Sequence, residues 1–281
     1  MRKNNTVAAQ FDARSSKFSR SASWVTDKRL LAAHKKAVFG LLPAKGRLLE
    51  VCCGTGVVTG AIKRRGLETY GVDISTGMLK QAAKRIRHLR RADAHKLPFS
   101  SGFFDAVVMR QAMQFLRPAA FLKEAKRVLK PGGVLLLSHH VPRGEAERSR
   151  LLVIYRLIQP SGVFRNASKL YLAQELRGYL AGAGFRVKKV TRLFTTEPIS
   201  ALLACYPNLP AAGKERIFQE YLKAPAGAGK ACGIVRKEGA LCARWKWVVF
   251  TALKPERQAA ALNTRYAPYA TLSMVRSVTF I

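Results

Sequence analysis

The chain is constrained most by a regular alternation of short apolar runs and amphipathic segments, which begins near residue 46. This alternation indicates βαβ units and a mainly parallel sheet. In such sheets, ligands bind at the carboxyl ends of the strands, near the point where the strand order reverses. Strands are predicted at 47–51, 68–72, 104–109, 134–138, 185–187 and 245–250, and helices at 57–65, from Ser75 to about residue 91, at 118–129 and at 168–183.

Three parts of the chain fit this repeat poorly. The segments 141–167 and 191–244 interrupt it and are predicted to be cap insertions that cover the ligand-binding edge. Residues 1–40 precede the first strand and are predicted to form an N-terminal helical cap. The domain itself is predicted to span 41–254, followed by a loosely held tail at 255–281.

The sharpest local signal is a turn with two glycines, Gly54 and Gly56, between the first predicted strand and the helix that follows it. Glycines let a backbone approach a ligand closely, and a helix N-terminus offers unpaired N–H groups. The dinucleotide fingerprint needs a third glycine, which here falls one position late, at Gly60. A P-loop lysine is also absent. The turn therefore suits a nucleoside ligand better than a diphosphate.

Asp73 ends the second predicted strand, 17 residues after Gly56. An acid in this place accepts hydrogen bonds from both ribose hydroxyls in Rossmann-type sites. The alternative is an ordinary turn aspartate ahead of Ser75, which would then cap the next helix. Combined with the glycine turn, Asp73 favours a ribose-binding role.

At this point the chain resembles the class I S-adenosylmethionine-dependent methyltransferases of the type 11 group, which include ubiquinone- and menaquinone-biosynthesis C-methyltransferases. The resemblance covers about residues 46–140 and rests on motifs that occur in the family's order. It implies an α/β fold with a doubly wound, mainly parallel seven-stranded sheet. The motifs are Leu48 to Gly56, Gly71 to Ser75, Asp93-Ala94 with Leu97-Pro98-Phe99, Phe104 to Val108, and Phe121 to Gly133.

The resemblance also implies S-adenosyl-L-methionine as the cofactor and a role for each matching residue. Glu50, Gly54 and Gly56 would cradle the methionine part, together with Cys52 and Thr55 of the same turn. Asp73 would hold the ribose. Ile74 and Met78 would flank the adenine, while Asp93 would accept a hydrogen bond from the adenine amine and Ala94 would supply backbone contacts. One departure is that Cys52 stands where the family most often has its first glycine.

Candidates for catalysis lie just past the predicted strand ends. His139 and His140 follow the 134–138 strand, and either is predicted to act as a general base if the acceptor has a proton to lose. The alternative is that they are histidines packed under a loop or facing solvent. Arg110 and Gln111 follow the 104–109 strand and are predicted to contact the cofactor carboxylate or the acceptor.

The charge of the chain favours polyanionic partners, since 50 lysines and arginines face only 16 acids, a net charge of +34. The excess is spread nearly evenly along the chain. Two basic helix faces are predicted, at Lys80 to Arg91 and at Lys123 to Lys130, and both are interpreted as solvated faces rather than as one nucleic-acid groove. Amino-methylating nucleic-acid enzymes carry the motif Asn/Asp-Pro-Pro-Tyr/Phe at the end of the strand that corresponds to 104–109. This chain has Met109 to Ala112 there, so the motif is absent.

The five cysteines predict neither a disulfide framework nor a metal site, because their number is odd and no Cys-x-x-Cys pair occurs. A cytoplasmic protein is therefore expected. No membrane span and no secretory signal is predicted.

The prediction for function is methyl transfer to a small, partly apolar acceptor of the quinone, lipid or secondary-metabolite kind. The cap segments are predicted to enclose it, because such pockets are concave and apolar. Two alternatives stay open: a methyltransferase that acts on RNA or on an acidic carrier-bound substrate, and a non-catalytic cofactor-binding protein. The aromatic side chains offered by the cap are Phe11, Phe18, Trp24, Tyr155, Phe164, Phe194 and Tyr206.

Overall fold

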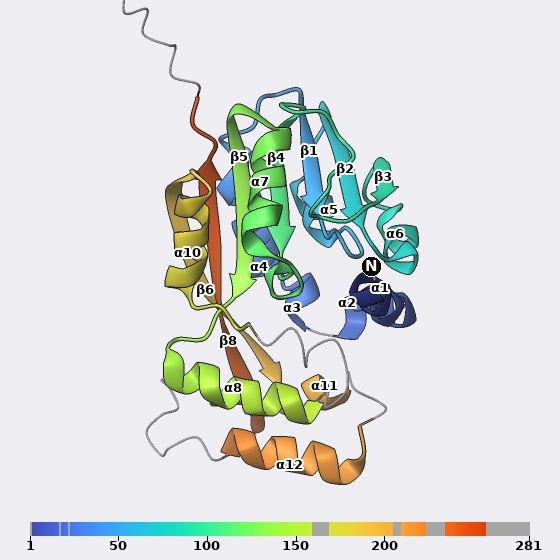
Figure 1. The fold of residues 1–281 in the computed structure, drawn as a ribbon. Coiled ribbons are helices and arrows are strands. Elements are labelled where there is room, and N and C mark those ends of the chain that lie inside the picture. Colours follow the sequence, from blue (N-terminus) through green and yellow to red (C-terminus); the bar gives the residue numbers. More distant parts are fainter. Residues whose placement is uncertain are drawn as a thin grey trace, which may run out of the picture.

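A computed structural model of the chain describes residues 2–16, 18–21, 23–158, 169–204, 209–222 and 234–256. The described residues form one mixed sheet with the strand order β3-β2-β1-β4-β5-β8-β6, and β7 pairs with β8 (Figure 1). The strands are β1 (Gly46–Val51), β2 (Leu67–Asp73), β3 (His88–Arg91), β4 (Phe104–Arg110), β5 (Leu129–His140), β6 (Arg186–Pro198), β7 (Ile234–Lys237) and β8 (Ala240–Leu253).

Strand directions confirm the predicted doubly wound, mainly parallel sheet. β1 pairs in parallel with β2 and β4, β2 pairs in parallel with β3, and β4 pairs in parallel with β5. Only β8 runs against its neighbours β5 and β6, and β7 forms a hairpin with it. The strand order reverses between β1 and β4, so a ligand is expected outside the carboxyl ends of these two strands.

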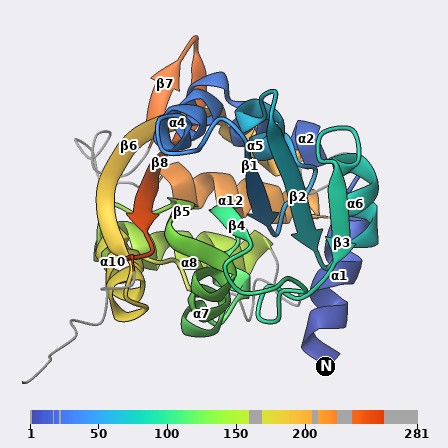
Figure 2. The ribbon, with the colours of Figure 1, turned by 90° about the horizontal axis from the view of Figure 1, so that it is seen from above.

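Helices cover both faces of the sheet, with α4 and α5 on one side and α7 and α10 on the other (Figure 2). Successive side chains of a strand point to opposite faces. Leu48 of β1 therefore packs with Val58 and Ile62 of α5, while Leu49 packs with Phe121 of α7. The helices on these faces are α4 (Lys28–Phe39), α5 (Val57–Ile62), α6 (Thr76–Ala82), α7 (Pro118–Val128) and α10 (Ala173–Gly182).

The remaining helices gather near the carboxyl ends of the parallel strands (Figure 1). The N-terminal helices α1 (Arg2–Arg14) and α2 (Phe18–Ser21) lie near α6 and the end of β2, and α3 (Ser23–Thr26) packs against α4 and β6. A 3-10 turn η1 (Met113–Phe115) follows β4. α8 (Glu145–Ile158), α11 (Ile199–Ala204) and α12 (Ala211–Leu222) lie around the far ends of the paired strands β6 and β8. None of the helices in the described ranges is long and apolar enough to cross a membrane.

The predicted helix from Ser75 to about residue 91 was wrong in its second half. Ser75 caps α6 by accepting the Met78 N–H at 3.0 Å, but the helix ends at Ala82. Residues 88–91 instead form β3, which pairs in parallel with β2 at one edge of the sheet. The basic residues from Lys80 to Arg91, which repeat at helical spacing in the sequence, therefore do not share one helix face. Arg90 and Arg91 are exposed at the sheet edge, where charged side chains discourage pairing with another strand.

Three other boundaries differ from the prediction because long-range pairing extends the strands. β5 includes the segment 130–133, predicted as a turn, and reaches His140, two residues past its predicted end. β6 and β8 pair over twelve positions, so 191–198 and 240–244, predicted as insertion, are strand residues. The domain boundaries as a whole stay a prediction. Phe164, Tyr206 and the predicted tail from residue 257 onward lie outside the described residues.

Candidate active site

A cavity lies at the carboxyl ends of β1, β2 and β4, where the strand order reverses. Aromatic residues Phe11, Phe18 and Trp24 from the N-terminal helices complete its wall. Gly56 does not line it. The cavity brings together the other ten residues that the sequence predicts for cofactor binding: Glu50, Cys52, Gly54, Thr55, Asp73, Ile74, Met78, Asp93, Ala94 and Arg110.

The glycine turn is built from residues with positive φ at every second position. Cys52, Gly54 and Gly56 have φ values of 53°, 52° and 73°. A side chain on Gly56 would lie 3.1 Å from Ile86, so this glycine lets the start of α5 pack closely under α6. Gly54 has open space instead, since only Phe18 comes within 4 Å of a Cβ placed there, at 3.9 Å. The turn therefore leaves the backbone of Gly54 accessible to the cavity.

Cys52 adopts a left-handed conformation that is unfavourable for a residue with a Cβ. This explains why a glycine suits the position. We expect Cys52→Gly to be more stable than Cys52→Ala by about 1 kcal/mol, because both variants remove the thiol and only alanine retains the strain. Urea unfolding of the two variants measures the difference.

The matched control is Cys53, which is buried and is not among the residues with positive φ. At Cys53 the order should invert, with alanine more stable than glycine, since glycine loses more backbone entropy on folding. The same order at both positions would contradict the strain assigned to Cys52.

Asp73 connects the end of β2 to the glycine turn. Its Oδ2 accepts the N–H of Gly54 at 2.9 Å, and its Oδ1 accepts the N–H of Ser75 at 2.9 Å. Burial raises the pKa of this carboxyl, and the N–H bonds of Ser75 and Gly54 oppose that rise. Each carboxylate oxygen can accept a second hydrogen bond, so Asp73 can hold the turn and a ligand at once.

Glu50 lies at the floor of the cavity and is buried. Its Oε2 accepts the backbone N–H of Thr59 at 2.9 Å and the Thr59 hydroxyl at 2.5 Å. Burial raises the pKa of this carboxyl to about 7, against the lowering effect of the Thr59 bonds and of the Arg110 charge. Glu50 is therefore poised to ionise when a cation enters the cavity.

Asp93 and His95 follow β3 and line the same cavity. The Asp93 Oδ1 accepts the backbone N–H of His95 at 2.9 Å and lies 2.6 Å from its Nδ1. The Nε2 of His95 accepts the Arg117 N–H at 2.9 Å, so the ring proton is on Nδ1 and is donated to Asp93. His95 thus orients the carboxylate of Asp93, a role that the sequence did not reveal.

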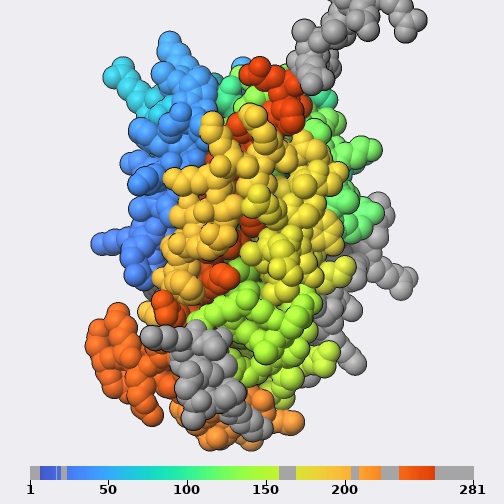
Figure 3. Space-filling model, turned by 90° about the vertical axis from the view of Figure 1, so that its left-hand side faces the viewer, coloured from blue at the N-terminus to red at the C-terminus, as the bar shows by residue number. Residues whose placement is uncertain are grey.

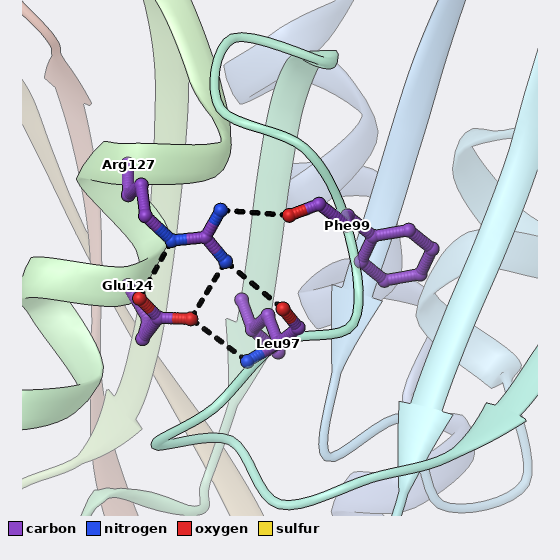
Figure 4. Close-up of polar contacts among 4 residues, drawn as sticks. All are labelled: Leu97, Phe99, Glu124 and Arg127. Atoms are coloured by element: carbon purple, nitrogen blue, oxygen red, sulfur yellow. Dashed lines mark hydrogen bonds and ion pairs between the residues drawn. The ribbon is translucent and has the colours of Figure 1, made fainter.

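The loop that carries Asp93 and His95 is held against α7 by an arginine–glutamate pair (Figure 4). Arg127 donates to the carbonyls of Phe99 at 2.7 Å and Leu97 at 2.9 Å, and Glu124 accepts the Leu97 N–H at 2.8 Å. Arg127 is one of the residues of the second predicted basic face. Two others are also occupied, since Lys126 donates to the Ala183 carbonyl at 2.9 Å and Lys130 pairs with Asp105 at 2.6 Å. Most basic side chains of this predicted face therefore bind groups of the same chain.

Arg110 ends β4 and closes another side of the cavity. Its Nη1 donates to the carbonyl of Val25 at 3.1 Å, and its guanidinium lies 5.2 Å from the centre of the Trp24 ring. Burial lowers the pKa of Arg110 to about 10, so it is charged at neutral pH. Arg110 forms no ion pair with any residue that the structure describes.

The N-terminal helices are fastened to the domain by Asp12, which sequence reasoning had not assigned to the site. Its Oδ1 accepts the Ser75 hydroxyl at 2.6 Å and the Gly77 N–H at 2.7 Å, both at the start of α6. These hydrogen bonds lower the pKa of Asp12. The neighbouring Phe11 lies edge-on to Phe18 and to Phe115. Asp12 thus holds an aromatic roof over the cavity.

We expect Asp12→Ala and Gly77→Ala to loosen α1. A Cβ on Gly77 would lie 2.6 Å from the Ser15 hydroxyl and 3.1 Å from the Asp12 carboxylate, so α1 must move. Amide hydrogen exchange along residues 7–14 should become faster in both variants. Gly182→Ala is the control, because a Cβ there has nothing within 4 Å. Unchanged exchange in both variants would mean that Asp12 does not fasten α1.

His139 and His140 do not line the cavity, and both are buried. They point to opposite faces of the sheet because they are consecutive strand residues. Burial lowers the pKa of His139 to about 4 and that of His140 to about 3, so both rings are neutral at pH 7. Their proposed role as general bases stays a prediction.

Two glutamines connect these histidines to the cavity wall. Gln111, which lines the cavity, accepts the His140 N–H at 2.7 Å through its Oε1. Gln114 lies with its Oε1 2.9 Å from the Nε2 of His139. Gln111 also has a positive φ of 53°, a strained conformation that is typical of functional sites. The position of Gln111 at the end of a strand marked it as a candidate, whereas no local pattern in the sequence marks Gln114, because its partner lies on β5.

Among known proteins, residues 49–137 match the model of a methyltransferase domain family. This segment holds the glycine turn, Asp73, Asp93 and Arg110. The chain contains a methyltransferase domain. The matched residues hold β2, β3, β4 and most of β5, and the strands β6, β7 and β8 follow them.

The relatives agree with this assignment over part of the chain. A demethylmenaquinone methyltransferase of Corynebacterium kroppenstedtii is 34% identical over 136 residues, which cover 48% of this chain and 59% of that protein. The chain thus matches less than two thirds of the length of that relative.

Solved structures share the fold of the methyltransferase domain. The YcgJ protein of Bacillus subtilis has a TM-score of 0.67 at 20% identity, over 80% of this chain and 98% of that one. A geranyl diphosphate C-methyltransferase of Streptomyces coelicolor, solved with S-adenosyl-L-homocysteine, has a TM-score of 0.52 at 16% identity, over 80% of this chain and 77% of that one. At these identities the likeness concerns the fold alone.

Proposed function

We propose that the chain transfers a methyl group from S-adenosyl-L-methionine to a small, partly apolar acceptor. The observation that carries this proposal is the placement of three acids in one cavity at the ends of neighbouring strands. Glu50 comes from β1, Asp73 from β2 and Asp93 from just after β3. Their spacing along the sheet edge suits a long ligand with an ammonium, a ribose and an adenine amine.

The residues present complement this cofactor in charge as well. Arg110 is a cation in the cavity wall that lacks an ion-pair partner within the described residues, and it suits the carboxylate of the methionine part. Glu50 suits the ammonium, because an adjacent cation favours its ionised form. Asp93 suits the adenine amine, because it lines the cavity and its carboxylate is oriented by the two hydrogen bonds from His95.

When bound, the cofactor supplies a methyl group on a sulfonium that is a good leaving group. The protein's own contribution is to orient the two reactants and to exclude water. Asp73 and the glycine turn fix the nucleoside end. The roof formed by Phe11, Phe18 and Trp24 provides the apolar enclosure for an acceptor. The Corynebacterium relative is a demethylmenaquinone methyltransferase, so a reduced quinone is the first acceptor to test.

Calorimetric titration with S-adenosyl-L-methionine, S-adenosyl-L-homocysteine and NAD tests the cofactor. We expect the first two to bind and NAD not to bind. Failure of the first two, or tighter binding of NAD, would overturn the proposal. Transfer of labelled methyl to a demethylated quinol then tests the acceptor, with total RNA as the comparison. Labelled RNA would favour the RNA-directed alternative, and cofactor binding without transfer to any acceptor would favour a non-catalytic protein.

A further inference from the structure

A second site is indicated by an arginine whose guanidinium makes no hydrogen bond to any described residue. Arg143 follows the end of β5, where the chain continues the antiparallel pairing through the Val141 N–H, which donates to the Lys246 carbonyl at 2.9 Å. All three guanidinium nitrogens of Arg143 are shielded from solvent and lack a hydrogen-bond partner within the described residues. Leaving such a group unpaired is costly, and arginine does not lose its proton in proteins.

The nearest acid does not remove this cost. Glu147 is the one acid in the described residues that forms an ion pair with Arg143, and its Oε2 lies 3.9 Å from the Arg143 Nε. The same oxygen accepts the backbone N–H of Arg143 at 2.6 Å. Glu147 therefore binds the backbone at the start of α8 rather than the guanidinium.

A second arginine lies beside the first, on the same aromatic ring. The guanidinium carbon of Arg143 is 5.7 Å from the centre of the Phe194 ring, and that of Arg244 is 4.1 Å from it. Within the described residues Arg244 forms no hydrogen bond or ion pair through its guanidinium. Since both guanidinium groups contact the same ring, their charges repel each other, and a nearby anion attracts both.

This arrangement suits an oxyanion. A guanidinium that stacks on an aromatic face leaves its N–H edge free, and that edge matches carboxylate and phosphate oxygens. On one face of the molecule α8 lies beside β6 and β8 (Figure 3). The Arg143 side chain is 16% exposed, but its guanidinium nitrogens are shielded, so a ligand must displace the groups that cover them.

We propose that Arg143 and Arg244, supported by Phe194, form a site for a carboxylate or phosphate group in the cap. The site is separate from the cofactor cavity, because none of the three residues lines it. An acceptor that carries an acidic group is the ligand that this site selects. The inference that the acceptor carries an acidic group rests on the proposed methyl transfer. The binding of an oxyanion by Arg143 and Arg244 does not depend on that proposal.

The test is calorimetric titration of the full chain with pyrophosphate and, separately, with succinate, which distinguishes phosphate from carboxylate. We expect at least one of them to bind the wild type, and to bind at least tenfold more weakly to Arg143→Met and Arg244→Gln. Arg156→Gln is the matched control, because it removes the same charge from an exposed position of α8. S-adenosyl-L-methionine should bind Arg143→Met as it binds the wild type, which separates this site from the cofactor cavity.

Stability provides a second readout. In buffer without oxyanions, Arg143→Met should melt at a higher temperature than the wild type, because a shielded guanidinium with no hydrogen bond to a described residue is replaced by an apolar side chain of similar length. Pyrophosphate or succinate should then stabilise the wild type and leave the variant unchanged. The proposal is overturned if neither anion binds the wild type, if Arg156→Gln loses as much affinity as Arg143→Met, or if Arg143→Met is the less stable protein without anions.

Discussion

Asp73→Ala is expected to weaken the binding of S-adenosyl-L-methionine by about fivefold to about 150-fold, which corresponds to a loss of about 1–3 kcal/mol for hydrogen bonds to a charged group. The carboxylate accepts N–H groups from Gly54 and Ser75 and is proposed to accept the ribose hydroxyls as well. Its removal therefore loosens the glycine turn and deletes the ribose contact together. Calorimetry at a fixed, moderate salt concentration measures the loss.

A cofactor analogue with a deoxyribose separates these two effects. If Asp73 binds the ribose, the analogue should bind the wild type more weakly than the natural cofactor, and Asp73→Ala should barely distinguish the two. Asp105→Asn is the control for general damage, because Asp105 accepts the Arg47 N–H and pairs with Lys130 at the opposite end of the sheet. Unchanged cofactor affinity in Asp73→Ala would remove this residue from the site.

Glu50 is expected to make cofactor binding depend on pH. Burial raises its pKa to about 7 in the free protein, and the ionised form is the one that attracts an ammonium. Affinity should therefore rise with pH, by up to about tenfold per unit from about pH 5 to about pH 7, and then level off. Glu50→Gln should abolish this dependence and bind more weakly than the wild type at about pH 8. A wild-type affinity that is flat over this range would contradict the assigned role.

The same carboxyl has a predictable effect on folding. Between about pH 4.5 and about pH 7 the folded protein keeps a proton on Glu50 that the unfolded chain releases, so the wild type loses stability as the pH rises through this window. Glu50→Gln lacks this loss. The difference in unfolding free energy between the two proteins should therefore grow toward neutral pH in favour of the variant. Taking the difference cancels the contributions of His139 and His140, whose lowered pKa values act in the opposite direction.

Sequence patterns located the parts of the site that depend on local structure. Glu50, Asp73 and Arg110 each come at the end of an apolar run, and the ends of neighbouring parallel strands meet at one edge of a sheet. The Ser75 cap and the proline at the start of α7 were local signals that the structure confirms. These signals fix where an element begins and which side chain stands at its end.

The residues that were missed act through partners far along the chain. Asp12 binds residues 63 and 65 positions away, and Gln114 contacts a residue 25 positions away. Segment 88–91 was assigned to a helix because its basic residues continue a helical spacing, whereas pairing with β2 decides its conformation. A single sequence does not show which segments pair with each other. At residues 88–91 the pairing with β2 therefore overrides the local helical pattern.

The antiparallel pair of β6 and β8 has a consequence for which parts of this protein can change independently. The match to the methyltransferase domain ends at residue 137, and β6 and β8, which complete the sheet, come after it. The far ends of the same two strands reach α8, α11 and α12. An exchange of residues 141–158 is therefore expected to leave the cofactor-binding cavity unchanged, because none of these residues lines it. The two strands join the residues around the cavity to a region that can be replaced without altering the cavity wall.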